Sequence, residues 1–455
     1  MTHLPASRRP IVLAAAWLAF LGPFFFLVYG VCNWAASLRT DVPSFFFWWE
    51  HNIPFIPWMI VPYMSTDFLF ALALFMCRDK AELQILAYRY IAAIGISAIF
   101  FLFVPLRFSF PRPEVLGLPG TLFSVLTSFD KPYNQAPSLH ISLLAIQWVP
   151  FARNTSGVRK VILHCWFALI GLSTVFTYQH HIIDLYTGVM VAVLCFYLFP
   201  DCSVKQHEYS KSVTVSSTPE RPHFKIMGAY LCGALLTVLL AWQFWQTLHL
   251  LLWPAAALSL IAASYGGIGT AVFLKSSGTL SLCSQIALAP YLLGAHLSFL
   301  RYTRGQVLFQ EIVPGVLIGR KLNSTEASQA IRTGVTAVID LTAEFSEAKP
   351  LRALAYLNLQ TMDLTPPSLQ QLNQAVAFIG REKAKGKTLV HCALGYARSA
   401  CVVAAYLMAA GHASTVHHAV EMIRTIRPGI VLDSDALLLL ERFRETLPSG
   451  NPVAA

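Results

Sequence analysis

Long apolar stretches follow one another through the first 300 residues of the chain and are separated by short polar connections. A helix needs roughly 20 mostly apolar residues to cross the hydrocarbon core of a bilayer. The stretches predict nine membrane spans, near residues 11–32, 54–76, 90–106, 138–152, 161–179, 182–199, 225–246, 248–272 and 279–300. We therefore expect a six-helix membrane domain over residues 1–200, a polar linker over 201–224 and additional membrane helices over 225–300.

Beyond residue 305 the pattern changes to short apolar runs that alternate with amphipathic helices. Strands are predicted at 335–341, near 355–360 and at 388–390, and helices at 367–383, 399–408 and 414–426. Strands that alternate with helices are typical of an α/β unit with a mostly parallel sheet. The predicted fold class is thus a multi-span α-helical membrane bundle followed by an α/β domain over residues 305–447.

The composition agrees with a chain that lies mostly in lipid. Hydrophobic residues make up 56% of the chain and charged residues 12%, whereas an ordinary soluble protein carries roughly 25% charged residues. The net charge of +10 comes mainly from basic residues between the apolar stretches. This distribution indicates topology signals and contact with anionic lipid, and it argues against nucleic acid as a partner.

Basic residues also indicate which connections face the cytoplasm, because short cytoplasmic loops are enriched in Lys and Arg. They gather at alternate connections, as Arg8, Arg9, Arg78, Lys80, Arg153, Arg159, Lys160, Lys205, Lys211, Arg221 and Lys225. The segment 107–137, the start of the fourth span and the turn between the fifth and sixth spans then meet on the outer face.

Three polar clusters lie at this outer face, at residues 107–113, 137–140 and 180–184. Ionisable residues at the end of a span are costly, so they point to function. His180 and Asp184 are four residues apart on a predicted helix, and the carboxylate can therefore orient the imidazole as a nucleophile.

The other polar residues of these clusters suit phosphoryl transfer. His140 is placed to protonate a leaving oxygen. Arg112, and with it Arg107 or Lys131, is suited to bind phosphoryl oxygens.

Together the clusters resemble the motifs of the type 2 phosphatidic acid phosphatase superfamily, which are KxxxxxxRP, PSGH and SRxxxxxHxxxD. The matching residues are Arg112, Pro113, Pro137, Ser138, His140, Ser173, His180 and Asp184. The resemblance implies a phosphohistidine intermediate on His180, oriented by Asp184. It also implies that His140 is the general acid and that Ser138 belongs to the phosphate-binding motif.

Three positions depart from this family. Pro105 stands in the lysine slot, Leu139 replaces the glycine of PSGH, and Thr174 replaces the arginine of the third motif. Two phosphate-binding cations are thereby lost, and the Ser-Leu-His form resembles the branch that contains inositol phosphorylceramide synthase. Transfer of a phospho-headgroup to an alcohol therefore stays open beside hydrolysis.

The most specific motif is His-Cys-Ala-Leu-Gly-Tyr-Ala-Arg-Ser at residues 391–399. A strand, a tight loop that contains Gly395 and the start of a helix direct backbone N–H groups into one concavity, which suits a phosphate dianion. The same field lowers the pKa of Cys392 and so favours a nucleophilic thiolate. Arg398 can bind two phosphoryl oxygens at once, and Ser399 can donate to the sulfur when it leaves.

Phosphoryl transfer at this loop also needs a general acid. Asp363 follows the strand predicted near 355–360 and is our candidate. Asp340 is the competitor, but it falls at the end of a predicted strand, where a structural role is expected.

These residues match the HCxxGxxRS motif of the cysteine-dependent dual-specificity phosphatases, which the chain resembles over 305–447. The loop interior lacks the cations of many lipid-directed members, yet attachment to a membrane concentrates lipid substrates. We therefore expect membrane lipid phosphates as partners, with phosphoproteins as the alternative. Neither site offers the ligand set of a metal centre, and we expect no metal and no cofactor.

The expected location is a bacterial inner (cytoplasmic) membrane, with the histidine site on its outer face. Nine spans from a cytoplasmic N-terminus would export the C-terminal domain, whereas Arg301, Arg304, Arg320 and Lys321 indicate a cytoplasmic flank. A reactive thiolate also needs a reducing compartment. We therefore expect the C-terminal domain in the cytoplasm, with one of the last three spans re-entrant or divided.

Overall fold

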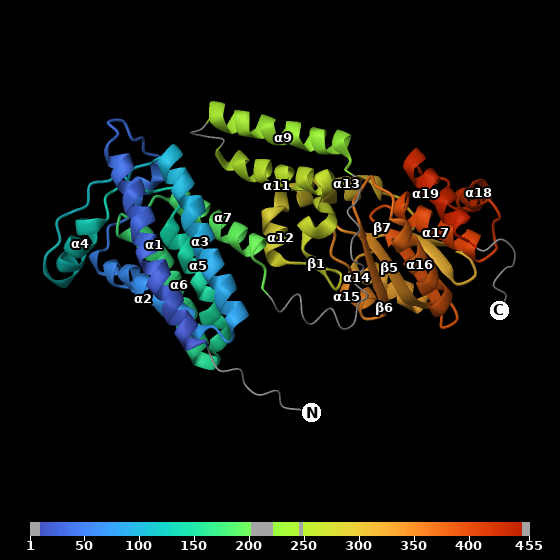
Figure 1. The fold of residues 1–455 in the computed structure, drawn as a ribbon, viewed down its shortest axis with the longest axis horizontal. Helices are drawn as coiled ribbons and strands as arrows, with labels where there is room; N and C mark the ends of the chain where they lie inside the picture. The colour runs from blue at the N-terminus through green and yellow to red at the C-terminus, as the bar shows by residue number, and fades with distance from the viewer. Residues whose placement is uncertain (1–9, 202–221, 245–248, 448–455) are drawn as a thin grey trace. The chain divides into compact units, whose positions relative to one another are not determined.

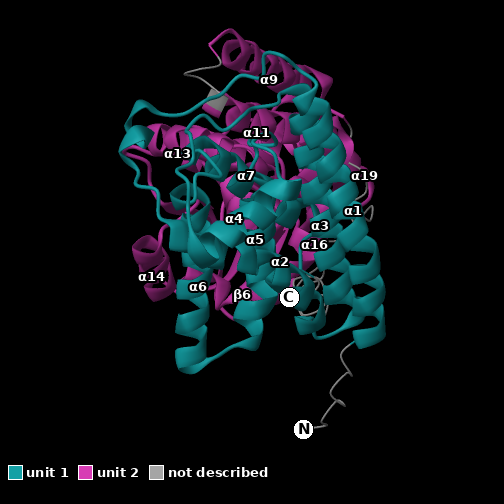
Figure 2. Cartoon of the chain, turned by 90° about the vertical axis from the view of Figure 1, so that its left-hand side faces the viewer, with its two compact units in different colours: residues 1–205 teal, residues 206–455 magenta. Residues whose placement is uncertain are grey.

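A computed structural model describes residues 10–201, 222–244 and 249–447 of the chain. The chain forms two compact units, Met1–Lys205 and Gln206–Ala455, which Figure 2 distinguishes by colour. Most of the predicted linker 201–224 lies outside the described residues, as do Arg8, Arg9, Lys205, Lys211 and Arg221.

The first unit is built from helices. They are α1 (Ile11–Ser37), the short turns η1 (Trp48–Asn52) and η2 (Pro57–Met59), α2 (Ile60–Met76), α3 (Lys80–Phe103), α4 (Gly117–Phe129), α5 (Leu139–Asn154), α6 (Gly157–Phe176) and α7 (Ile182–Leu198). One apolar core joins α1, α2, α3, α5, α6 and α7. Asp79 caps α3 by accepting from the Glu82 amide, and Ser138 caps α5 by accepting from the Ile141 amide.

The second unit begins with apolar helices and continues into the α/β domain (Figure 1). Its first elements are α9 (Phe224–Gln243), η3 (His249–Leu251), α11 (Leu252–Ala263), η4 (Ser264–Ile268), η5 (Gly269–Phe273), β1 (Lys275–Ser276), β2 (Thr279–Leu280), α12 (Leu282–Ala287) and α13 (Ala289–Tyr302). Helices α9 and α11 pack against each other. Strands β1 and β2 form a two-residue antiparallel hairpin.

Within the described residues, six helices are long and apolar enough to cross a membrane. They are Ile11–Ser37, Pro57–Met76, Lys80–Phe103, Gly157–Phe176, Phe224–Gln243 and Leu252–Phe273. Helices α5 and α7, predicted as spans, have 16 and 17 residues.

The stretch 279–300 does not form a single ninth span, which agrees with the expectation that one of the last three spans is re-entrant or divided. This stretch is divided into β2, α12 and α13, and α13 has only 14 residues. The hairpin turns at Gly278, whose φ of +74° favours glycine. Pro290 at the start of α13 prevents α12 from continuing, because proline lacks the amide that the helix needs.

The α/β domain contains a five-stranded sheet in the order β3-β4-β7-β5-β6. The strands are β3 (Phe309–Val313), β4 (Val316–Arg320), β5 (Val335–Thr342), β6 (Ala355–Thr361) and β7 (Lys387–Cys392). Only β3 and β4 pair antiparallel, and the other pairs are parallel. The prediction of a mostly parallel sheet is confirmed.

Helices cover both faces of this sheet. They are α14 (Ser324–Arg332), α15 (Lys349–Arg352), α16 (Leu369–Glu382), α17 (Arg398–Ala409), α18 (Val416–Ile426) and α19 (Ser434–Glu445). Ile339 of β5 lies in the core shared with α16 to α19, whereas Val338 lies in the core shared with α14 and α15. Successive side chains of a strand point to opposite faces, so the two cores lie on opposite sides of the sheet.

Candidate active sites

Cys392 lies at the carboxyl end of the central strand β7, directly before the loop that leads to α17. The flanking strands place Arg320 beside Cys392 and Asp340 beside His391. Because parallel strands end at the same edge, the carboxyl ends of β4, β5 and β6 also border this loop. The strand, loop and helix therefore stand where the sequence predicted them.

The loop wraps its polar groups around the Cys392 sulfur. The Gly395 amide donates to Sγ at 3.2 Å, and Ser399 Oγ lies 3.4 Å from Sγ. Gly395 has a φ of +74°, and a Cβ there would lie 2.5 Å from the Gly319 carbonyl oxygen, so the position requires glycine.

Electrostatics favour the thiolate form of Cys392. Burial raises the pKa of the thiol, but the Arg398 guanidinium, the Ser399 hydroxyl and the amides of Ser399 and Gly395 outweigh burial, so the pKa is lowered overall. A thiolate is the nucleophilic form of cysteine, so the site is prepared for attack on phosphorus.

Arg398 is buried and held in place from several sides. Glu344 accepts from both terminal nitrogens, at 3.1 Å and 2.7 Å, and the Thr361 carbonyl accepts at 2.8 Å. Sequence reasoning missed Glu344, which stands in the loop after β5. This carboxylate orients the guanidinium and balances its charge.

Asp363 follows β6, as predicted. Its carboxylate accepts from Arg398 at 3.1 Å, and its side chain is 55% exposed whereas Arg398 is 3% exposed. The acid therefore lies at the open side of the guanidinium, where a leaving group would depart. Asp340 is fully buried on β5 and accepts from Lys275 and Tyr356, which agrees with the structural role expected for it.

A second arginine, Arg427, was not predicted. It donates hydrogen bonds to backbone carbonyl groups of the Cys392 loop. Its Nε donates to the Gly395 carbonyl at 2.9 Å, and Nη2 donates to the Leu394 carbonyl at 3.2 Å. Its Nη1 also donates to Gln310 at 3.1 Å. These bonds hold the Leu394 and Gly395 carbonyl groups toward Arg427. The amides of the loop are then left to bind the phosphate.

The histidine site in the first unit joins two of the predicted motifs. His180 Nδ1 lies 3.3 Å from Asp184 Oδ2, and both side chains are buried. The Ser138 amide donates to the Asp184 carbonyl at 3.0 Å. Gly188 makes this approach possible, because a Cβ there would lie 2.5 Å from the Ser138 carbonyl oxygen.

His140 lies at the start of α5 and interacts electrostatically with His180. Its Nε2 is 2.9 Å from Thr66 Oγ1, and its ring stacks on Tyr63 at 4.2 Å between centroids. The structure thus brings the two histidines of the predicted pair into one neighbourhood.

Of the three predicted cations, Arg112 is the one built into this region. Its Nη2 donates to the Tyr178 carbonyl at 3.2 Å, two residues before His180, and its guanidinium lies over the Phe123 ring. Arg107 is exposed, and Lys131 is exposed and donates to Ser37. The phosphate-binding role of Arg107 and Lys131 stays a prediction.

Sequence reasoning also missed the buried pair of Glu50 and His181. Glu50 Oε2 lies 2.9 Å from His181 Nδ1, and the Ser109 amide donates to His181 Nε2 at 3.2 Å. Because Nε2 accepts, the proton of a neutral His181 stands on Nδ1 and faces Glu50. His181 therefore joins the segment of the first motif to the helix that carries Asp184.

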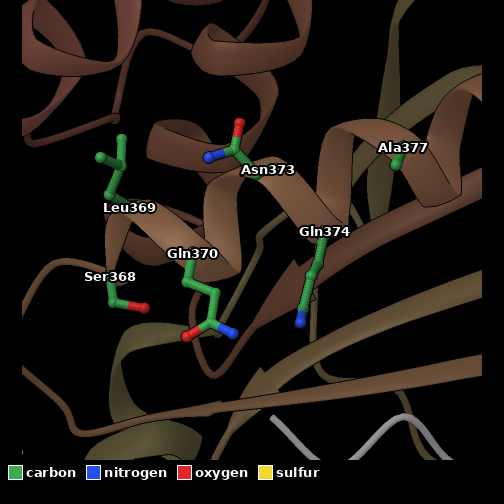
Figure 3. A pocket seen from close by; sticks show the side chains of 6 residues that line it. All are labelled: Ser368, Leu369, Gln370, Asn373, Gln374 and Ala377. Atoms are coloured by element: carbon green, nitrogen blue, oxygen red, sulfur yellow. The ribbon is translucent and has the colours of Figure 1, made fainter. Parts of the chain in front are cut away.

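One surface hollow lies along α16 and is lined by Ser368, Leu369, Gln370, Asn373, Gln374 and Ala377 (Figure 3). None of these six side chains titrates in the physiological range. The hollow therefore offers no general acid for phosphoryl transfer, and the hydroxyl of Ser368 caps α16 by accepting from the Gln371 amide.

Comparisons with known proteins agree with both sites. Residues 86–208 match the family model described as PAP2 superfamily, and residues 316–444 match the model described as dual specificity phosphatase, catalytic domain.

Three curated relatives are similar to the C-terminal part. Mouse dual specificity protein phosphatase 12 is 31% identical over 26% of this chain and 36% of its own length. Mouse phosphatidylglycerophosphatase and protein-tyrosine phosphatase 1 is 37% identical over 20% of this chain and 48% of its own. The phosphatidylglycerophosphate phosphatase PTPMT2 of Arabidopsis thaliana is 35% identical over 25% of this chain and 52% of its own.

The chain therefore spans between about a third and a half of the length of these relatives. The membrane helices and the two family matches identify a membrane protein in which a PAP2 superfamily domain is fused to a dual specificity phosphatase catalytic domain.

Proposed function

We propose that this protein is a bifunctional membrane phosphatase that acts on lipid phosphates, with a histidine nucleophile in the first unit and a cysteine nucleophile in the second. The observation that carries the proposal is the thiolate cradle of Cys392. Its sulfur accepts from the Gly395 amide at 3.2 Å, beside a buried guanidinium that is held by Glu344. A pocket that stabilises both the thiolate and a phosphoryl group suits covalent phosphoryl transfer.

At the cysteine site, Sγ of Cys392 attacks phosphorus, and the bond from phosphorus to the leaving oxygen breaks. Asp363 gives its proton to that oxygen, while Arg398 binds two of the remaining phosphoryl oxygens. Water then attacks phosphorus, gives a proton to Asp363 and releases inorganic phosphate. Ser399 Oγ, 3.4 Å from Sγ, donates to the sulfur as the sulfur–phosphorus bond breaks.

At the histidine site, His180 attacks phosphorus through Nε2, because Asp184 lies at Nδ1 and holds a proton there. His140 protonates the leaving oxygen as its bond to phosphorus breaks, and Arg112 binds the phosphoryl group. Water then attacks phosphorus, gives a proton to His140, and inorganic phosphate leaves as the bond from Nε2 to phosphorus breaks. Ser138 connects the two motifs through its amide.

A second candidate for the histidine site is transfer of a phospho-headgroup to a lipid alcohol. Thr174 stands in the slot where the family has an arginine, and its hydroxyl donates to the Gly171 carbonyl at 2.7 Å. With Pro105 in the lysine slot, the site has two cations fewer around the phosphate, which favours a phosphodiester substrate with less charge than a phosphomonoester.

Two observations favour a lipid substrate for the cysteine site over a phosphoprotein. The second unit contains two helices long and apolar enough to cross a membrane, so the site is tethered near lipid. Two similar proteins are named as phosphatases of phosphatidylglycerophosphate, and one of the two names also includes protein-tyrosine phosphatase. Phosphoproteins would be the substrates if lipid phosphates are not hydrolysed.

We also propose that the cysteine site faces the cytoplasm, as expected for a bacterial inner membrane protein, and that the histidine site faces outward. Without the ninth span, the predicted spans number eight. An even number of crossings places the residues before the first span and those after the last span on the same side of the membrane. A cysteine introduced at exposed Arg442 should react with a membrane-impermeant maleimide only after the membrane is opened.

The test is phosphate release by the purified full chain from phosphatidylglycerophosphate and phosphatidic acid in mixed micelles, with and without a lipid alcohol acceptor. Cys392→Ser and His180→Ala should each abolish a separate activity. The matched controls are Cys401→Ser, a buried cysteine of α17 outside the site, and His164→Ala, a histidine of α6 that accepts from Trp148. A double variant of Cys392 and His180 that keeps full turnover would refute the proposal.

A further inference from the structure

We infer that the hairpin β1–β2 is part of the cysteine site, and that Lys275 in this hairpin is a positioning residue for the Cys392 loop. The hairpin lies more than thirty residues before the matched catalytic domain, which begins at residue 316. It directly follows the apolar helical segment Leu252–Phe273. The inference rests on the proposed cysteine-dependent activity and adds to it an element from the membrane-proximal part of the unit.

The hairpin is bound to the catalytic domain along its whole length. Gln360 donates to the Lys275 carbonyl at 3.0 Å, and the Leu280 amide donates to Ser346 Oγ at 3.0 Å. At the turn, the Glu347 amide donates to the Gly278 carbonyl at 2.7 Å. A Cβ at Gly278 would lie 2.5 Å from the Tyr356 hydroxyl oxygen, so the turn fits closely.

The Lys275 side chain enters the interior of the catalytic domain. Its ammonium donates to Asp340 Oδ2 at 2.7 Å, to the Thr342 carbonyl at 2.7 Å and to Thr342 Oγ1 at 3.1 Å. Both partners of the ion pair are 0% exposed. All three protons of the ammonium are thus used, which is the condition under which a buried charge is tolerated.

From Asp340 the network reaches the nucleophile. Asp340 stands beside His391 in the sheet, and His391 Nε2 lies 2.6 Å from Glu347 Oε2. The other ring nitrogen of His391 lies 3.3 Å from the Cys392 carbonyl oxygen. Both ring nitrogens lie near oxygens, an arrangement that favours the imidazolium, and these neighbours raise the pKa of His391 to about 9.

Four buried groups of alternating charge therefore follow one another, from Lys275 through Asp340 and His391 to Glu347. Lys321 also interacts electrostatically with Asp340, Glu347 and Lys275. Asp340, Glu347 and His391 also form a grouping in which a metal ion could be considered, since their ligand atoms lie within 4.8 Å of one another. The Lys275 ammonium supplies the positive charge there instead. The hairpin contacts both acids of the network, one through Lys275 and the other through the Gly278 carbonyl.

Removal of the Lys275 charge would take away the buried cationic partner of Asp340 and make the surroundings of the Cys392 loop more negative. The other charged groups that face the Cys392 sulfur are Arg398 from α17 and Arg427 from the segment after α18. Arg398 is itself paired with Glu344 and Asp363. A Lys275 variant leaves these groups unchanged. A shift in the pH midpoint of Cys392 alkylation would therefore report on the hairpin network.

The experiment compares Lys275→Met with Lys387→Met in the full chain. Lys387 makes an ion pair of the same length, 2.7 Å with Glu311, but it is exposed. Hydrolysis of p-nitrophenyl phosphate is measured, together with the pH dependence of Cys392 alkylation by iodoacetamide. We expect Lys275→Met to lower kcat at least tenfold with KM changed less than threefold, and to move the alkylation midpoint upward. Lys387→Met should stay within twofold of the parent chain.

The second variant, Lys275→Met combined with Asp340→Asn, removes both charges of the ion pair and so keeps the net charge of the parent chain. It should recover at least a third of the lost kcat, which a merely structural role of Lys275 would not allow. Alkylation of buried Cys401 reports unfolding. If Lys275→Met exposes Cys401, Ser346→Ala decides instead, because it removes only the acceptor of the Leu280 amide, and a two- to fivefold loss of kcat is expected.

A kcat within twofold of the parent chain for Lys275→Met, or no recovery in the double variant, would overturn the inference. Alkylation needs no turnover. If the parent chain hydrolyses no phosphate ester, the proposed function fails, while the upward shift of the Cys392 midpoint in Lys275→Met still tests the hairpin.

Discussion

Deprotonation of His391 should destabilise the second unit as the pH rises above neutrality. Burial lowers the pKa of this imidazole, but the Glu347 carboxylate at 2.6 Å, Asp340 and the Cys392 carbonyl outweigh burial and raise it from 6.5 to about 9. A group whose pKa is raised in the folded state binds its proton more tightly there than in the unfolded chain. Its stabilisation is therefore complete below pH 6.5 and is lost as the pH passes through about 9.

The size of the effect follows from this shift. Each unit of pKa corresponds to about 1.4 kcal/mol, so the shift of His391 from 6.5 to about 9 contributes about 3 kcal/mol of folding free energy. A change of 1 kcal/mol moves the Tm of a unit of this size by roughly 2–4 °C, so the Tm should fall by roughly 6–12 °C between pH 6.5 and pH 9.

The assay is thermal unfolding of the purified Cys392→Ser chain at several pH values. This background is needed because the pKa of Cys392 is lowered, so the thiolate adds stability as the pH rises and opposes the imidazole. His391→Gln should remove the pH slope, whereas His412→Gln, which changes an exposed histidine, should keep it. A Tm that stays constant or rises from pH 6.5 to pH 9 would show that the reasoning about the buried imidazolium is wrong.

Three substitutions test the remaining geometry. Asp363→Asn should lower kcat on alkyl phosphates by roughly 10²–10⁴ and change p-nitrophenyl phosphate hydrolysis far less, because that leaving group needs no proton; comparable losses on both would exclude a general acid. Glu344→Gln weakens the buried pair with Arg398 and should raise KM and lower Tm, with about 3–5 kcal/mol as the upper bound for a broken buried pair; unchanged kinetics and Tm would contradict this. Gly188→Val brings a side chain onto the Ser138 carbonyl and should abolish only the His180-dependent activity, so an equal loss at the cysteine site would point to general misfolding.

The cysteine loop could be predicted closely because its determinants are local. A buried strand, a glycine at a positive φ and a helix start lie within residues 387–409, so the pattern of a few residues specifies the whole turn. The pairing of His180 with Asp184 was also predicted, but its premise that both residues lie on one helix is wrong, because α7 begins at Ile182 and His180 precedes it. The spacing did not reveal that Gly188 lets α7 approach the start of α5.

The supporting partners could not be predicted, because each is remote in sequence. Glu344 lies 54 residues before Arg398, Lys275 lies 65 residues before Asp340, and Glu50 lies 131 residues before His181. Isolated charged residues of this kind are indistinguishable from exposed ones in the sequence. Their burial and their pairing follow only when the sheet and the helices bring distant segments together.

Average hydropathy explains why a span was predicted over 279–300. The stretch is apolar enough for a span, but the average does not register a turn at Gly278 or a helix break before Pro290. The Lys275 ammonium, fully buried against Asp340, could not enter lipid at such a cost. In the prediction of membrane spans, a lysine at the end of an apolar segment should therefore count for more than the mean hydropathy of the residues that follow it.

The hairpin also bears on the proposed sidedness without any count of the helices in the first unit. Helix α9 and the segment Leu252–Phe273 are the two candidate spans of the second unit, and the hairpin that follows them is bound to the catalytic domain. One crossing outward and one back return the chain to the side where α9 begins. Lys225 lies at that start, and basic residues mark the cytoplasmic side. The cysteine site would then share its compartment with this basic flank, and a reducing compartment is the one in which the Cys392 thiolate stays available as a nucleophile.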